Sequence, residues 1–84
     1  MKNRLQAPVP IMWKGRPRSV SSVLEAAEML VDPCWPVRGR RHRLACKAVA
    51  EWSERPSEIR LKMLQEALRD AASEAGILIS TSIH

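Results

Sequence analysis

The residues best suited to chemistry are one histidine and two cysteines in the middle of the chain. His42 and Cys46 lie four residues apart and would share one face of a helix, and Cys34 lies shortly upstream. Thiolate and imidazole groups are typical zinc ligands, but structural zinc sites use paired short spacings such as C-x-x-C, which the sequence lacks. We therefore expect no metal, no cofactor, and two reduced thiols.

The sequence also lacks the motifs of the common catalytic sites. It contains no G-x-S-x-G, Walker or H-E-x-x-H pattern. A pair formed by Cys46 and His42 would be a nucleophile and its base, but neighbours four apart on a helix more often simply touch. We predict that the chain is not an enzyme.

Charge is the strongest compositional signal. The chain has 14 Lys and Arg against 9 Asp and Glu, a net charge of +5. Residues 1–19 and 38–50 are basic blocks, whereas residues 20–37 are acidic. Basic blocks of this kind favour a polyanion such as nucleic acid, although they also occur as plain solvated surface. The candidate anion-binding or nucleic-acid-binding residues are Arg16, Arg18, Arg38, Arg40, Arg41, Arg43, Lys47 and Arg60.

Within these candidates, Arg40, Arg43 and Lys47 recur at three and four residues and would form one row on a helix. We expect Arg16 and Arg18, in or near a hairpin turn with Lys14, to lie beside that row. No aromatic side chain interrupts the row, so it would contact phosphates without reading bases.

A second arrangement involves Trp35, Arg41 and Arg60. Both arginines fall in the first turn of a predicted helix, on its apolar side. Either their guanidinium groups reach solvent or a helix carboxylate, or they clamp a small carboxylate or phosphate. Trp35 would pack over the core in the first case and offer a ligand-stacking platform in the second.

The elements that position these residues begin with a hairpin. Residues 7–14 alternate in polarity and predict a strand, Gly15 predicts a turn, and residues 18–20 predict a short returning strand. At the other end of the chain, residues 77–83 alternate again and predict a strand that pairs with the hairpin.

Three helices are predicted between these strands. Ser22 and Glu25 have the spacing of a capping box, and Asp32-Pro33 ends the first helix. The second runs from about Arg40 to Ser53, and the third from residues 55–57 to Ala75 with Gly76 as its C-terminal cap. The predicted fold is α+β, with the order β-β-α-α-α-β and helices on one face of a small sheet. The apolar stripe expected on the first helix is Val23, Ala26, Ala27, Leu30 and Val31.

The length of 84 residues fits one small domain, residues 1–84, with residues 1–6 as a flexible basic N-terminus. No apolar run is long enough to span a membrane and no signal peptide is evident, so we expect a cytoplasmic protein without a membrane partner. Open sheet edges and an apolar last strand favour self-association as a dimer.

Several short segments together resemble a known family. These are Glu25-Ala26-Ala27, Trp35-Pro36 followed by Gly39 and His42, then Arg60, and Ala71-Ala72 with Glu74-Ala75-Gly76-Ile77. The chain resembles, over residues 9–80, domain-of-unknown-function family nine-eight-two, a family of small proteins of rhizobia and related alphaproteobacteria. The resemblance implies no known activity, cofactor or catalytic residue.

Three functions remain. The leading prediction is a non-enzymatic interaction or regulatory module that binds a protein and associates with itself. The alternative is a nucleic-acid-binding accessory protein that uses the basic helix face. The second alternative is a small-anion sensor built around Trp35, Arg41 and Arg60.

Overall fold

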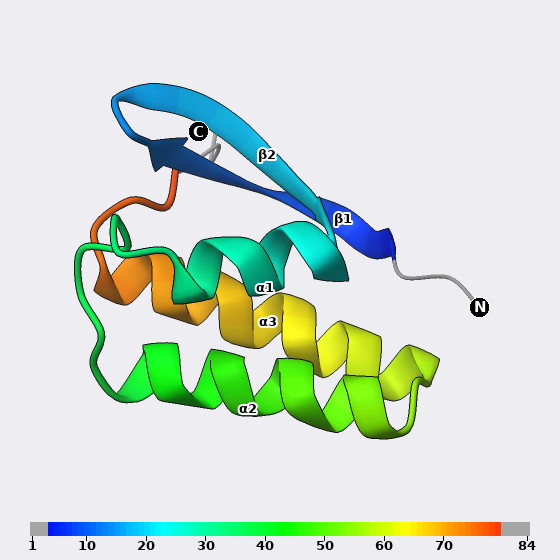
Figure 1. The fold of residues 1–84 in the computed structure, drawn as a ribbon. Helices are drawn as coiled ribbons and strands as arrows, with labels where there is room; N and C mark the ends of the chain where they lie inside the picture. The colour runs from blue at the N-terminus through cyan, green and yellow to red at the C-terminus, as the bar shows by residue number, and fades with distance from the viewer. Residues whose placement is uncertain (1–3, 80–84) are drawn as a thin grey trace.

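A computed structural model describes residues 4–79 and shows a two-stranded hairpin followed by three helices (Figure 1), which confirms the α+β class. The elements are β1 (Arg4–Trp13), β2 (Arg16–Ser22), α1 (Val23–Val31), α2 (Arg40–Glu54) and α3 (Glu58–Glu74).

The hairpin closes through the two residues Lys14 and Gly15. Trp13 pairs with Arg16 across an antiparallel ladder, and the turn residues have φ angles of 52° and 80°. Two positive φ values define a type I′ turn, whose twist matches that of the strands it joins. The turn predicted at Gly15 is therefore confirmed.

Residues 4–6 belong to β1, which corrects the expectation of a flexible N-terminus over residues 1–6. Arg4 pairs with Ser22 beyond an irregularity in the register, and Leu5 is buried. Burial of this leucine side chain holds the segment against the core. Residues 1–3 lie outside the described residues.

The C-terminal segment lies along one edge of β1. Leu78 forms an isolated antiparallel bridge with Ile11. The Met12 N–H donates to the Ile77 carbonyl at 2.7 Å, and the Ile79 N–H donates to the Pro10 carbonyl at 3.0 Å. Residues 77–79 thus form a bridge and not a continuous strand, and the rest of the predicted strand, residues 80–83, lies outside the described residues.

The opposite edge of the sheet, formed by β2, has few free donors. Because the even-numbered residues of β1 face the C-terminal segment, the paired residues of β2 direct Pro17, Ser19 and Ser21 outward. Pro17 has no N–H, and the Ser21 N–H donates to Glu25 Oε1 at 3.3 Å. An edge of this composition is a poor template for another strand.

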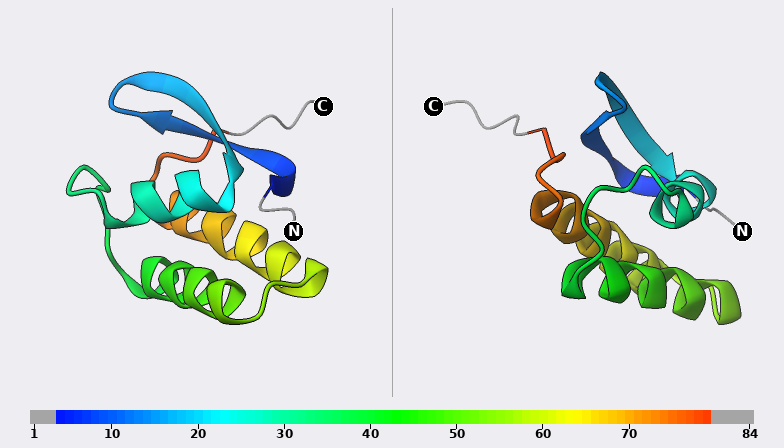
Figure 2. Two further views of the ribbon diagram at one scale, coloured as in Figure 1. Left: turned by 45° about the vertical axis from the view of Figure 1, so that its right-hand side comes forward. Right: turned by 60° about the vertical axis from the view of Figure 1, so that its left-hand side comes forward.

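The helices form two layers beneath the sheet (Figures 1 and 2). α3 packs against β1, and α1 packs against β2, whereas α2 packs against α3 and α1 on the side away from the hairpin. The expectation that all helices pack on the sheet is therefore wrong for α2, because α1 and α3 already cover the face of so small a sheet.

The core lies between the sheet and the α1–α3 layer. Val31, expected in the buried stripe of α1, is 70% exposed, and Met29 is buried instead. The reason is that the face of α1 with Met29 packs against the core, whereas α2 does not cover the face with Val31. The buried apolar residues are Leu5, Val9, Ile11, Trp13, Val20, Val23, Ala26, Met29, Leu30, Trp35, Ala45, Leu61, Leu64, Leu68, Ala71 and Ala72.

A hydrogen-bonded connector, residues 32–39, joins α1 to α2. Asp32 Oδ1 accepts the Cys34 N–H at 2.8 Å, and the Asp32 carbonyl accepts the Trp35 N–H at 3.0 Å and Arg38 Nη2 at 2.6 Å. Trp35 inserts its side chain into the core, where it is 2% exposed. The connector is therefore held at its start, at its end and through its middle.

The first turn of α2 is capped by α3. Its N-cap residue, Gly39, has no side chain, and Glu74 at the end of α3 accepts the Arg41 N–H at 3.2 Å and the His42 N–H at 3.4 Å. These are two of the N–H groups that a helix leaves without partners. A Cβ at Gly39 would lie 2.8 Å from Glu74 Oε2, so glycine here makes room for the carboxylate.

We expect Gly39→Ala to destabilise the protein by about 1 kcal/mol, because displacing Glu74 removes a helix cap. In a Glu74→Ala background the same substitution should cost less, since no carboxylate then occupies the space that the new Cβ needs. Urea denaturation of the four proteins of this double-mutant cycle measures the coupling. Additive effects would contradict the contact.

Candidate functional site

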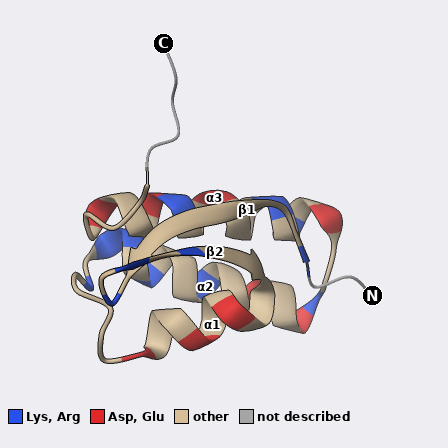
Figure 3. Ribbon diagram, turned by 90° about the horizontal axis from the view of Figure 1, so that it is seen from above, with Lys and Arg blue, Asp and Glu red and all other residues tan. Residues whose placement is uncertain are grey.

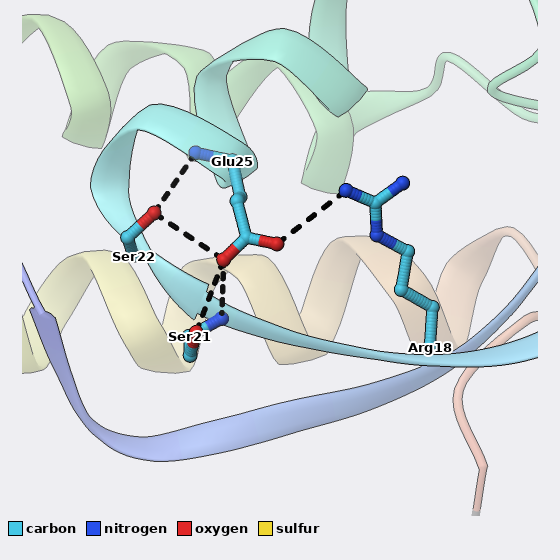
Figure 4. A network of polar contacts seen from close by, with 4 residues as sticks. All are labelled: Arg18, Ser21, Ser22 and Glu25. Carbon is cyan, nitrogen blue, oxygen red and sulfur yellow. Dashed lines mark hydrogen bonds and ion pairs between the residues drawn. The ribbon is translucent and has the colours of Figure 1, made fainter.

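The basic residues predicted to bind anions are divided among separate parts of the molecule. Arg16 and Arg18 lie on β2, where Arg18 Nη2 is 3.5 Å from Glu25 Oε2 (Figures 3 and 4). Arg38 donates from Nη2 to the Asp32 carbonyl at the end of α1. A cation at this position complements the negative end of a helix. Arg38 thus has a structural role.

Arg41 and Arg60 are tied to opposite ends of α2. Arg41 Nη1 lies 3.3 Å from Asp70 Oδ2, whereas Arg60 Nη1 donates to the Glu51 carbonyl at 3.0 Å. Ten residues of helix separate Arg41 from Glu51, which is about 15 Å at the rise of an α-helix. The structure does not bring the two arginines together around one small anion.

Trp35 is enclosed by other rings. Its ring centroid lies 6.0 Å from that of Trp13 and 5.9 Å from that of His42. A ligand could stack on Trp35 only after displacing one of these neighbours. The Trp35 Nε1 atom is buried and has no hydrogen-bond partner within residues 4–79.

The row formed by Arg40, Arg43 and Lys47 lies on the outer side of α2. All three side chains are exposed, and within the described part of the chain none of them forms an ion pair or a side-chain hydrogen bond. The hairpin lies beyond the α1–α3 layer, so Arg16 and Arg18 do not flank the row (Figure 1). The expected surface that combines both groups is therefore not formed.

His42 and Cys46 are partners in packing. His42 is 8% exposed, and its Nε2 lies 2.6 Å from the Leu30 carbonyl, which requires that Nε2 carry the proton and donate. Cys46 Sγ lies 3.9 Å from the imidazole, and burial raises the pKa of its thiol. Cys34 is exposed, and residues 4–79 contain no cluster of three potential metal ligands.

An apolar groove between α1 and α2 is the feature that the sequence reasoning missed. It holds about 80 Å³, and is lined by Ala27, Leu30, Val31, Cys46 and Val49. Leu24 on the same side of α1 is 62% exposed, and Val31 on the groove wall is 70% exposed. Their spacing of seven residues, which places both on one helix face, was the available signal.

Charged residues border this groove on both sides. Glu28 lies four residues after Leu24 on the exposed side of α1, and Arg43 lies three residues before Cys46 on α2. The wall formed by α1 therefore has an acidic residue at its border, and the wall formed by α2 has a basic one. We call this surface the α1–α2 face, and define it by Leu24, Ala27, Glu28, Leu30, Val31, Arg43, Cys46 and Val49.

Glu25, the other acid of α1, is held by the hairpin (Figure 4). Its Oε1 accepts Ser21 Oγ at 3.0 Å and Ser22 Oγ at 3.4 Å, and its N–H donates to Ser22 Oγ at 3.2 Å. The Ser22 half of the predicted capping box is formed, whereas the Glu25 carboxylate accepts the N–H of Ser21, at 3.3 Å, in place of the N-cap N–H of Ser22. The hydrogen bond from the Ser21 side chain is the largest cause that lowers the pKa of Glu25 below 4.5.

No helix within residues 4–79 has the length and apolar composition needed to cross a membrane. No protein-family model matches the chain, and no curated protein or solved structure shows significant similarity to it. The family resemblance stays a prediction from sequence.

The Glu25 network predicts a pH dependence of stability. Because the pKa of Glu25 is lower in the folded chain than in the unfolded chain, the unfolded chain binds more protons as the pH falls from about 4.5. The free energy of unfolding should therefore decrease toward acid, and Glu25→Gln should make that decrease shallower. Urea denaturation between pH 3 and pH 7 measures it. Glu28→Gln, a matched charge change outside the network, should retain the larger part of the slope, and equal slopes for both variants would exclude the network as the cause.

Proposed function

We propose that the protein is a non-enzymatic protein-interaction module and that the α1–α2 face is its binding surface. The observation that carries the proposal is the position of Leu24 and Val31, two large apolar side chains that are mostly exposed beside an apolar groove. Burial of apolar area is the main driving force of protein association. The two side chains lie on one face of α1, so a partner could cover both together.

The shape of the face favours a helical ligand. Two helices form its walls, and the small side chain of Ala27 and the half-buried Cys46 and Val49 leave room between them. An amphipathic helix binds such a groove through anchors spaced three, four and seven residues apart. The short length of α1, nine residues, limits the contact to about two helical turns.

Site-specific photo-crosslinking in the native host tests this proposal. A photoreactive phenylalanine analogue at position 24 should form a protein adduct, because Leu24 borders the groove and is 62% exposed. Val31→Asp should abolish that adduct, since it places a charge in the groove wall. Mass spectrometry of the adduct identifies the partner.

The matched control places the same analogue at position 59 of α3, where Ile59 is also exposed, at 74%. This position should give no adduct that depends on Val31. Absence of any adduct at position 24, or equal adducts at both positions, would refute the proposed binding surface.

The row on α2 supports a second candidate function, the binding of a polyanion such as nucleic acid. Its specific support is that Arg40, Arg43 and Lys47 are exposed and unpaired within residues 4–79, whereas Arg18 and Arg41 each face a carboxylate. Unpaired cations can release the counterions of phosphates without first breaking ion pairs.

Replacing Arg40, Arg43 and Lys47 together with alanine should abolish binding to duplex DNA at low salt. Three phosphate contacts predict a slope of about −3 for the logarithm of affinity against the logarithm of salt concentration. Fluorescence anisotropy measures both effects. The control removes three other exposed charges, at Arg55, Lys62 and Arg69, and should bind like the parent. Failure of the parent to bind at low salt would eliminate this candidate.

A further inference from the structure

We infer that the occupant of the α1–α2 face is a second copy of this chain, in a symmetric dimer whose two-fold axis runs along the groove. The inference rests on the proposed binding surface and adds its partner. It is carried by two observations, the exposed anchors of α1 and the opposite charges at the two borders of the face.

The chain itself contains the helix that its groove requires. Leu24, Ala27 and Val31 lie at positions i, i+3 and i+7 of α1 and form one stripe on its outer side. The exposed fractions of Leu24 and Val31, 62% and 70%, show that this stripe is presented outward beside the groove. The stripe on α1 of one copy can therefore contact the α2 wall of the groove in another copy, and symmetry repeats the same contact in return.

The charges at the borders select one of the two possible symmetric arrangements. A two-fold axis along the groove places α1 of each copy opposite α2 of the other, so Glu28 at one border meets Arg43 at the other border. An axis across the groove would instead place α1 against α1 and oppose two copies of Glu28. Opposite charges fix register in interfaces, and like charges disfavour the wrong one.

Both charges are available for this contact. Glu25, the first acid of α1, accepts hydrogen bonds from Ser21 and Ser22 and pairs with Arg18. Glu28 and Arg43 are exposed, and within residues 4–79 they have no ion-pair partner. Glu28 and Arg43 can therefore pair between two copies without first breaking an ion pair in their own chain.

The sheet edge formed by β2 does not offer a competing route to a dimer. Pro17 lacks an N–H, and the Ser21 N–H is already bonded to Glu25. Edge-to-edge pairing of β2 with another strand would leave these ladder positions without bonds. This moves the dimer expected from the sequence from the strands to the helices.

Sedimentation equilibrium of the purified 84-residue chain, over micromolar to millimolar concentrations, tests the inference with a charge swap. Glu28→Arg and Arg43→Glu should each weaken the dimer roughly five- to tenfold, because symmetry removes two ion pairs and introduces two like-charge contacts. The double variant restores both pairs in reversed sense and should dimerise within about twofold of the parent.

Apolar substitutions provide the second comparison. Val31→Asp should weaken the dimer by more than tenfold, since it places a charge in the contact, whereas Ile59→Asp should leave it unchanged. Val31 and Ile59 are both more than two-thirds exposed, at 70% and 74%, so neither substitution places a charge in the core. Circular dichroism confirms that each variant is folded.

Two results would overturn the inference. The first is a parent protein that stays monomeric to millimolar concentration, and the second is a double charge variant no better than the single ones. These failures are distinct from failure of the proposed function. A monomeric parent with a Val31-dependent adduct to a different protein would retain the binding surface and replace its occupant. Absence of any Val31-dependent adduct, to this chain or to another protein, would remove the surface itself.

Discussion

The contact between the Glu74 carboxylate and the first turn of α2 is the interaction on which the arrangement of the two candidate surfaces depends. α2 packs mainly against α3 and α1, which therefore set its position. At one end Glu74 caps its first turn, and at the other end Arg60 bonds to the Glu51 carbonyl. A helix fastened at both ends to α3 has one side left for α1 and one side for solvent. The groove lies on the first side and the basic row on the second, and Arg43 belongs to both surfaces.

The parts of the fold that follow from the sequence are those decided within a few residues. The Ser22 half of the capping box starts α1, and Gly76, with a φ of 73°, terminates α3. Each of these signals depends on local hydrogen bonding or on backbone sterics, which the neighbouring residues determine. The placement of α2 depends instead on Glu74 and Gly39, which lie 35 residues apart. No periodicity within a helix reveals which distant side chain will cap it.

In the candidate site, too, some features follow from neighbouring residues and others depend on contacts between distant ones. Spacing alone placed Arg40, Arg43 and Lys47 on one exposed row, because helical phase follows from the sequence. Spacing could not show that Arg41 and Arg60 lie at opposite ends of α2, since that depends on the antiparallel packing of two helices. The groove was missed because an apolar residue such as Val31 is assigned to the core by default. Its exposure depends on how far α2 stands from α1.

The connector between α1 and α2 further restricts that separation. Its start is closed by hydrogen bonds to Asp32, its middle is anchored by Trp35 in the core, and it contains Pro33 and Pro36, whose φ angles are fixed by their rings. The two walls of the groove are therefore held at their spacing before any ligand arrives. A preorganised site loses little conformational entropy on binding, so even a small contact area can yield measurable affinity. The proposed recognition by this face would then be closer to rigid docking than to coupled folding, and partners would exchange without local unfolding of either helix.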